Sequence, residues 1–166
     1  MDKYYYLVSS LPLLKFAERP FLTKEEFIIE ARKWLEDADF IILSKADINN
    51  FLEHKKDIPT LKKYKKFELS LREELASYRK VRIKKVEYKI RKDLSDIIQD
   101  NKNPLEIEIG LLFLRWEFLN EEEVGHFFDL SFLIIYYLKL QILERLFSFD
   151  KEKGKERLEA YSSVEL

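Results

Sequence analysis

Residues 130–148 read LSFLIIYYLKLQILERLFS and contain neither glycine nor proline. A helix over this range is apolar nearly all round in its first three turns, which is typical of a helix buried on every side. The apolar run is too short to cross a bilayer, since a spanning helix needs about 20 apolar residues. We therefore predict that residues 130–148 form the central core helix of a bundle, with Asp129 as its N-terminal cap.

The composition of the whole chain agrees with a helical fold. The 166 residues are 46% hydrophobic and 37% charged, which fits one compact domain over residues 1–166. Three glycines and four prolines are too few for the tight turns of a β-sandwich or barrel. The sequence has no cysteine, which excludes a disulfide framework and a thiolate zinc site. The predicted fold class is an all-α helical bundle.

Local signals place the helices of the N-terminal third. Thr23 and Glu26 have the spacing of a capping box, which predicts an amphipathic helix over 24–37. Asp47 is predicted to cap a second, short helix that ends before Pro59. Residues 4–8 are apolar, but the run is too brief to separate a strand from a helical turn.

Residues 60–100 predict the longest helical segment. They contain no glycine or proline and consist mostly of good helix formers, which favours one long helix or two nearly collinear ones. Forty helical residues would extend about 60 Å, so this segment is expected to project from the bundle or to break. Its apolar pattern changes phase near residues 79–82, and from Ile83 to Ile97 it has coiled-coil-like spacing. That second series is a candidate seam for a homodimer.

The segments after residue 100 carry local signals too. Pro104 fits the first turn of a helix that runs to about residue 119. Asn120 with the three glutamates after it resembles a cap and acidic first turn of a further short segment, ended near Gly125. A charged helix is predicted over 150–161.

Charge is distributed very unevenly along the chain. Residues 55–92 contain 15 Lys and Arg against 5 Asp and Glu, whereas the whole chain carries a formal net charge of −1. Such a basic block can steer an acidic partner, and it can equally hold the basic and acidic parts of one chain together. Both interpretations stay open. The candidate partner-binding residues are the cations in and after the densest run: Arg79, Lys80, Arg82, Lys84, Lys85 and Lys89.

The same basic segment supports an alternative function as an independent binding module for nucleic acid or an anionic membrane surface. Tyr78 and Tyr88 could stack on bases beside the cations. However, no RNP, KH, zinc-finger or helix-turn-helix signature accompanies the segment, and the pI of the sequence is about 6.2. Contact with an acidic protein, or with an acidic segment of this chain, is therefore the favoured interpretation.

Chemistry-bearing motifs are sparse. Glu123 and His126 have an E-x-x-H spacing, which on one helical face is found in di-iron bundles, but no second such motif accompanies it. We interpret His126 as structural or capping. The acid pairs Asp93 with Asp96 and Glu106 with Glu108 are interpreted as surface charges. The sequence has no nucleophile elbow, phosphate-binding loop or dinucleotide fingerprint, so we expect no catalytic residue, metal, cofactor or small-molecule substrate.

Five stretches of the sequence resemble an uncharacterised family of small helical proteins encoded beside V-type ATPase genes in bacteria. They are KYYYLVSSLP at 3–12, NPLE at 103–106, RWEFL at 115–119, GHFFD at 125–129 and LKLQILER at 138–145. The middle of the chain is similar only in character, as a charged helix containing LREELA at 71–76. This family in turn is distantly similar to the C subunit of A/V-type ATPases, which is called d in eukaryotes.

That resemblance implies a function without catalysis. The C subunit is an all-helical funnel that caps the membrane rotor ring and receives the end of the central stalk, so a similar chain would couple rotation mechanically. The C subunit has three helical repeats and about twice this length, whereas this sequence shows no clear internal repeat. The implied role is a structural or accessory subunit in ion transport, in contact with stalk or ring subunits. We expect a cytoplasmic protein that is peripheral to the inner membrane through its protein partners.

Overall fold

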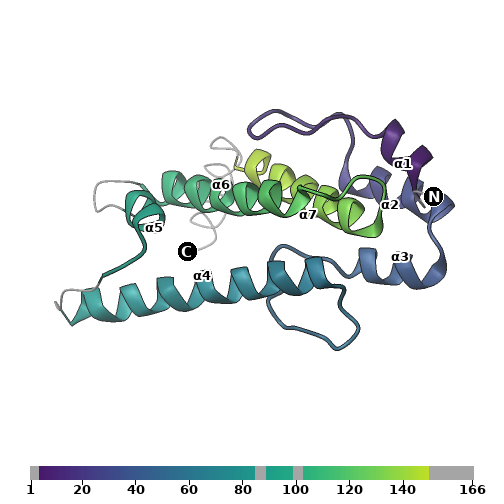
Figure 1. Cartoon of the computed structure of the whole chain (residues 1–166). Helices are drawn as coiled ribbons and strands as arrows, with labels where there is room; N and C mark the ends of the chain where they lie inside the picture. Colours follow the sequence, from purple (N-terminus) through teal and green to yellow (C-terminus); the bar gives the residue numbers. More distant parts are fainter. Residues whose placement is uncertain (1–3, 85–88, 99–102, 150–166) are drawn as a thin grey trace, which may run out of the picture.

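The computed structural model describes residues 4–84, 89–98 and 103–149. Within these ranges the chain forms seven helices and no strand, which confirms the all-α class. Figure 1 shows α4 running along one side of the molecule, and α6 and α7 lying together on the other. The helices are α1 (Tyr5–Ser10), α2 (Lys24–Trp34), α3 (Asp37–Ser44), α4 (Pro59–Ile83), α5 (Lys92–Ile97), α6 (Pro104–Glu123) and α7 (Leu130–Phe147).

Helix α7 is the centre of the fold, as predicted. Its buried residues include Leu133, Ile134 and Leu138, and it packs against α2, α3, α4 and α6. The carboxylate of Asp129 caps it by accepting a 2.8 Å hydrogen bond from the backbone N–H of Phe132. Contact on several sides explains why the helix is apolar nearly all round.

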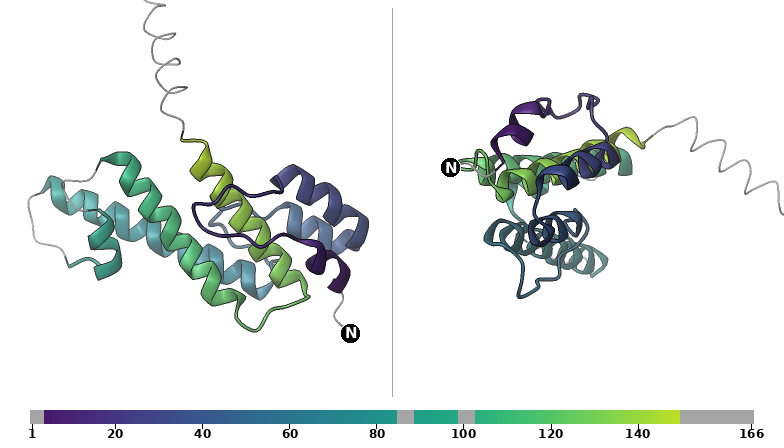
Figure 2. Two further views of the ribbon diagram at one scale, coloured as in Figure 1. Left: turned by 90° about the horizontal axis from the view of Figure 1, so that it is seen from above. Right: turned by 90° about the vertical axis from the view of Figure 1, so that its right-hand side faces the viewer.

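Two hydrophobic clusters divide the interior. The larger cluster joins α1, α2, α3, the first half of α4, the second half of α6, and α7. The smaller one joins the second half of α4 to α5 and the start of α6, and its buried residues are Leu71, Leu94, Ile98 and Leu111. Phe67 of α4 packs against both clusters, so α4 connects them along its length. The views in Figure 2 show α6 crossing above α4, with α5 at the end of the molecule away from α1, α2 and α3.

The segment over 60–100 forms a long helix that breaks, which is one of the two predicted outcomes, but its two parts are not collinear. Helix α4 ends at Ile83, and α5 is a separate short helix. The backbone N–H of Arg91 donates a 2.8 Å hydrogen bond to Oε1 of Glu74, so the chain has turned back alongside α4. The physical reason is burial: this reversal places Leu94 in the smaller cluster, where it is fully covered.

Three further local predictions differ from the structure. The capping box of Thr23 and Glu26 is present, but α2 ends at Trp34, and residues 37–44 form α3 instead. Asp47 caps no helix, because its Oδ1 accepts a 2.6 Å bond from the backbone N–H of Asn49 in a turn. Residues 120–123 are the last turn of α6 rather than the start of a new segment.

The chain between α6 and α7 reverses at Gly125, whose φ of 90° is a left-handed conformation that glycine adopts without strain. Residues 4–8, left open by the sequence, belong largely to α1. The helix predicted over 150–161 lies outside the described residues.

Within the described ranges, none of the helices combines the length and the apolar character needed to span a bilayer.

Candidate partner-binding surface

The C-terminal end of α4 presents the densest group of predicted partner-binding residues. Arg79, Lys80, Arg82 and Lys84 are all exposed there, and we call these four residues the basic end. Lys89, after the chain reversal, is also exposed. Lys85 lies outside the described residues.

Cations at this position also stabilise the helix itself. Lys80 and Arg82 lie in the last turn of α4, where the helix dipole is negative. The backbone N–H of Lys84 closes the helix by donating to the carbonyl oxygens of Lys80 and Arg82. A cation in this place contributes about 0.3–1 kcal/mol to an exposed helix. The helix dipole thus explains the positions of Lys80 and Arg82, but not those of the other cations in the basic run.

The basic end keeps its charge largely available. Arg82 takes part in an interaction within the chain. For Arg79, Lys80 and Lys84, no ion pair or side-chain hydrogen bond exists among the residues that the structure describes. Charges without partners are held in water and can attract an oppositely charged surface.

An apolar side chain lies among these cations. Ile83, the last residue of α4, is 84% exposed. An apolar side chain surrounded by charged ones has the arrangement of a protein interface, where an apolar centre is enclosed by a polar rim. The basic end with Ile83 is the candidate partner-binding surface.

The first half of the basic block has a different role. Lys63 forms a 2.9 Å ion pair with Glu122 of α6. Lys65 is only 2% exposed and forms a 2.7 Å pair with Asp57. These pairs agree with the interpretation that the basic block binds acidic parts of its own chain. For the basic end, the interpretation that it attracts an acidic partner stays open.

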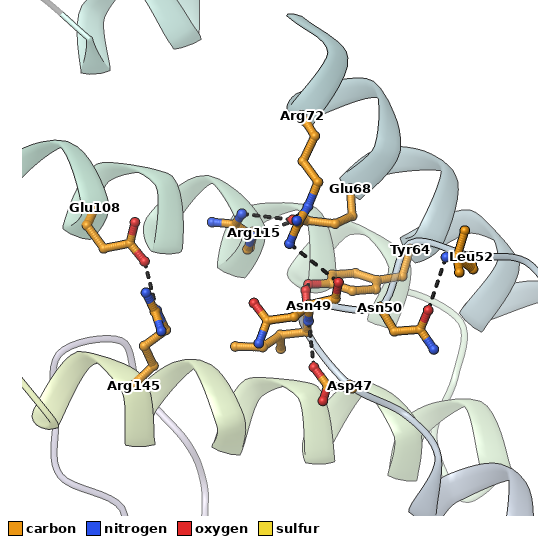
Figure 3. A network of polar contacts seen from close by, with 11 residues as sticks. Asp47, Asn49, Asn50, Leu52, Tyr64, Glu68, Arg72, Glu108, Arg115 and Arg145 are labelled. Carbon is orange, nitrogen blue, oxygen red and sulfur yellow. Dashed lines mark hydrogen bonds and ion pairs between the residues drawn. The ribbon is translucent and has the colours of Figure 1, made fainter. Parts of the chain in front are cut away.

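A buried ion-pair network fixes α4 to α6 (Figure 3). The Glu68 side chain is fully buried and accepts two hydrogen bonds from Arg115 of α6, at 2.8 and 2.9 Å. Arg72, one turn further along α4, donates a third bond of 2.7 Å to the same carboxylate. Burial lowers the pKa of Arg115, but the hydrogen bond and the charge of Glu68 outweigh it, and the net pKa is raised. The network is therefore a charged structural clamp between the two helices.

The clamp also holds the loop after α3. Arg72 reaches the carbonyl oxygen of Asn49, and Tyr64 donates a 2.9 Å hydrogen bond to the carbonyl oxygen of Ile48. Burial raises the pKa of Tyr64, so its hydroxyl keeps its proton. The loop over residues 45–58 is thus fastened to α4 by its backbone, and α4 is fastened to α6.

The E-x-x-H pair does not share a helical face. Glu123 is the last residue of α6 and forms an ion pair with Lys139 of α7, whereas His126 lies beyond the helix. The Nδ1 of His126 is 2.6 Å from Oδ2 of Asp129. No group of three or more His, Cys, Asp or Glu side chains among the described residues has the arrangement of a metal site. Each member of the pair has its own structural partner.

The acid pairs interpreted as surface charges also have local partners. Asp93 pairs with Arg91, and Asp96 has an interaction within the chain. Glu106 completes a capping box with Asn103 at the start of α6, and Glu108 forms a 2.8 Å pair with Arg145 of α7. The Asn103 capping box could have been recognised from its spacing, because it has the same pattern as Thr23 and Glu26.

The predicted homodimer seam does not form one continuous stripe. Ile83 lies on α4, whereas Ile90, Leu94 and Ile97 pack in the smaller cluster of the same chain. Tyr78, proposed to stack on bases, also packs against that cluster, and Tyr88 lies outside the described residues. The sequence pattern could not separate the two cases, because the same apolar residue types are buried inside one chain and in an interface between two chains.

Comparison with known proteins gives one match. Residues 89–160 match the model of a family described as "Protein of unknown function (DUF2764)". The prediction of an uncharacterised family is thus confirmed for this segment, which contains α5, α6 and α7. Neither the curated proteins nor the solved structures contain a match to the chain. The relation to V-type ATPases stays a prediction.

Proposed function

We propose that this chain is a non-enzymatic subunit or accessory protein of a bacterial V-type ATPase, and that it docks on stalk or ring subunits through the basic end of α4. The observation that carries the docking surface is the set of exposed cations around Ile83. The choice of complex rests on the sequence resemblance alone. Through such partners the protein would lie at the membrane without entering it.

The composition of the surface favours an acidic protein as its partner. A nucleic-acid site needs exposed rings or groove-reading side chains beside its cations, but Tyr78 is occupied by packing within the chain. A protein interface needs an apolar anchor, which Ile83 supplies. Charge steers the encounter, and burial of the isoleucine then adds to the affinity.

The arrangement of the buried acids supports a role without catalysis. A general acid or base must reach a substrate and exchange a proton near neutral pH. Glu68 is completely enclosed and bonded to two guanidinium groups, so its carboxyl group is not open to a substrate. Its position suits the stiffness that a mechanical linker between rotating parts requires.

The test is affinity purification of the tagged chain from native membranes in mild detergent, followed by mass spectrometry. The informative variant is Arg79→Gln/Lys80→Gln/Lys84→Gln, which removes three charges from the basic end. The matched control, Lys15→Gln/Lys33→Gln/Lys66→Gln, removes three exposed charges elsewhere.

We expect the wild type and the control to recover V-type ATPase stalk and ring subunits in near-equal amounts. Three interfacial charges, each contributing about 0.5 kcal/mol, predict roughly tenfold weaker recovery for the basic-end variant. Recovery of the complex by all three proteins alike would remove the basic end from the interface. If the wild type instead recovers nucleic acid, and does so with a steep loss on adding salt, the alternative function as an independent binding module replaces the proposal.

A further inference from the structure

A cavity of about 630 Å³ lies at the opposite end of α4 from the basic end. Helix α3 contributes Ile41 and Ile42 to its wall, α4 contributes Lys65, and the remaining lining residues come from residues 45–57. Its volume is within the range of about 300–1,000 Å³ that is typical of small-molecule sites. Lys65 and Lys80 are 15 residues apart on one helix, so the cavity is roughly 22 Å from the basic end.

Positive charge dominates the lining of this cavity. Lys45, Lys55, Lys56 and Lys65 line it together with His54, against a single carboxylate, that of Asp57. The carboxylate is already engaged: its Oδ2 accepts a 2.7 Å bond from Lys65 Nζ and a 2.8 Å bond from the backbone N–H of His54. Asp57 therefore balances the buried Lys65 and leaves the other three lysines uncompensated.

The turn that carries two of those lysines is fixed in place. The backbone N–H of Asp57 donates a 3.0 Å hydrogen bond to the carbonyl oxygen of His54, which closes a turn with Lys55 and Lys56 at its tip. The ion pair between Asp57 and Lys65 fastens this turn to α4. Burial raises the pKa of Asp57, but the Lys65 and His54 bonds outweigh burial, and the net pKa is lowered. The anchor thus stays ionised, and a preformed loop reduces the entropy lost when a ligand binds.

The free polar groups of the cavity are chiefly donors. Lys45, Lys55 and Lys56 have no ion pair or side-chain hydrogen bond with any described part of the chain. Oδ1 of Asn50 accepts a 3.0 Å bond from the backbone N–H of Leu52, which leaves the amide Nδ2 as the group that can still bind. Ammonium and amide N–H groups can only donate, so a ligand that satisfies them must be an acceptor.

From this lining we infer that the cavity binds a small organic anion that carries two or more phosphate or carboxylate groups. Two or more anionic groups are expected because three lysines without a partner among the described residues line one cavity, and an organic body is expected because Ile41 and Ile42 form an apolar part of the wall. A concave site of this size fits a small molecule better than the flat surface of a membrane or a protein. This ligand is additional to the protein partner proposed for the basic end.

Isothermal titration calorimetry on the full chain tests the inference, with inorganic pyrophosphate and citrate as separate probes. Pyrophosphate represents a phosphate-bearing ligand and citrate a carboxylate-bearing one. We expect at least one probe to bind with a dissociation constant below about 1 mM, since several charge-assisted hydrogen bonds form together. The probe that binds more tightly identifies the source of the anionic groups.

The double variant Lys55→Gln/Lys56→Gln should bind that probe at least about tenfold more weakly. The matched control Lys62→Gln/Lys66→Gln removes the same charge from α4 outside the cavity lining and should stay within about twofold of the wild type. None of the four residues is buried, and circular dichroism checks that each variant is folded.

Three results would overturn the inference: no binding of either probe at millimolar concentration, equal weakening in both variants, or weakening in neither. Binding of an acidic peptide without binding of either small anion would also refute it, in favour of a protein ligand. The Lys55→Gln/Lys56→Gln variant should still recover the ATPase subunits, because it leaves the basic end intact. Failure of one proposal is therefore separable from failure of the other.

Discussion

Replacing Glu68 by glutamine should strongly destabilise the fold. The change keeps the volume of the side chain but removes the charge that compensates Arg115, whose side chain is 12% exposed. Removing one partner of a buried ion pair typically costs about 3–5 kcal/mol, because the remaining charge stays in a poorly solvated place. We expect about 3 kcal/mol here, since the glutamine oxygen can still accept one of the hydrogen bonds.

Urea denaturation followed by circular dichroism measures this loss. With a urea dependence of about 2 kcal/mol per molar, a loss of about 3 kcal/mol lowers the midpoint by about 1.5 M. Domains of this kind have total stabilities of about 5–15 kcal/mol, so the variant should remain folded in buffer.

Glu108→Gln is the matched control. Glu108 lies on α6 and pairs with Arg145 of α7, but their side chains are 30% and 46% exposed. An exposed pair contributes about 0–1 kcal/mol, so this midpoint should move by less than about 0.5 M. Equal midpoint shifts for the two variants would refute the view that burial makes the Glu68 network a clamp. So would a Glu68→Gln loss below about 1 kcal/mol.

Three further predictions concern local features of the fold. Asp129→Ala should cost about 1 kcal/mol by removing the cap of α7, and Asp129→Asn should restore most of it in urea denaturation; equal losses would show that the cap is unimportant. Because the pKa of Asp57 is lowered in the folded state, the stability that it contributes is present above its unfolded pKa of about 3.9 and is lost as the pH falls through its folded pKa. The stability difference between wild type and Asp57→Asn should therefore shrink as the pH is lowered from about 5 to about 3, and a constant difference would contradict this assignment. Gly110→Ala should be destabilising, since the new Cβ would lie 2.8 Å from Cγ2 of Ile97, and overpacking costs about 1–3 kcal/mol. In an Ile97→Ala background the same change should become stabilising through helix propensity, and thermal unfolding that shows no such reversal would place the strain elsewhere.

The chain reversal after Ile83 is a feature that local sequence patterns do not predict. Residues 60–100 consist mostly of good helix formers, and helix propensity alone would continue the helix. Burial of Leu94 and Ile98 against α4 and α6 is worth more than the additional turns of an exposed helix. That gain depends on which residues meet across the fold, so no local window contains it.

The same limit applies to the candidate sites. The exposed cations of the basic end could be named from the sequence, because a dense charged run is almost always at the surface. The clamp could not be named, since Glu68 and Arg115 are 47 residues apart and each occurs in a stretch with other charged residues. The cavity depends in the same way on Lys45, the turn at Lys55 and Lys56, and α4 being brought together by the fold.

Consecutive residues were enough to specify the helical class, the central place of α7, and the caps at Thr23 and Asp129. Those features depend on interactions within about one helical turn or on the apolar periodicity of one segment, so they can be read locally. Contacts across the fold were needed to set where α4 ends, which carboxylate joins α4 to α6, and which lysines surround a cavity. In each of these cases the free energy of burial and charge pairing is fixed by neighbours that lie far apart in the chain and that no single segment specifies.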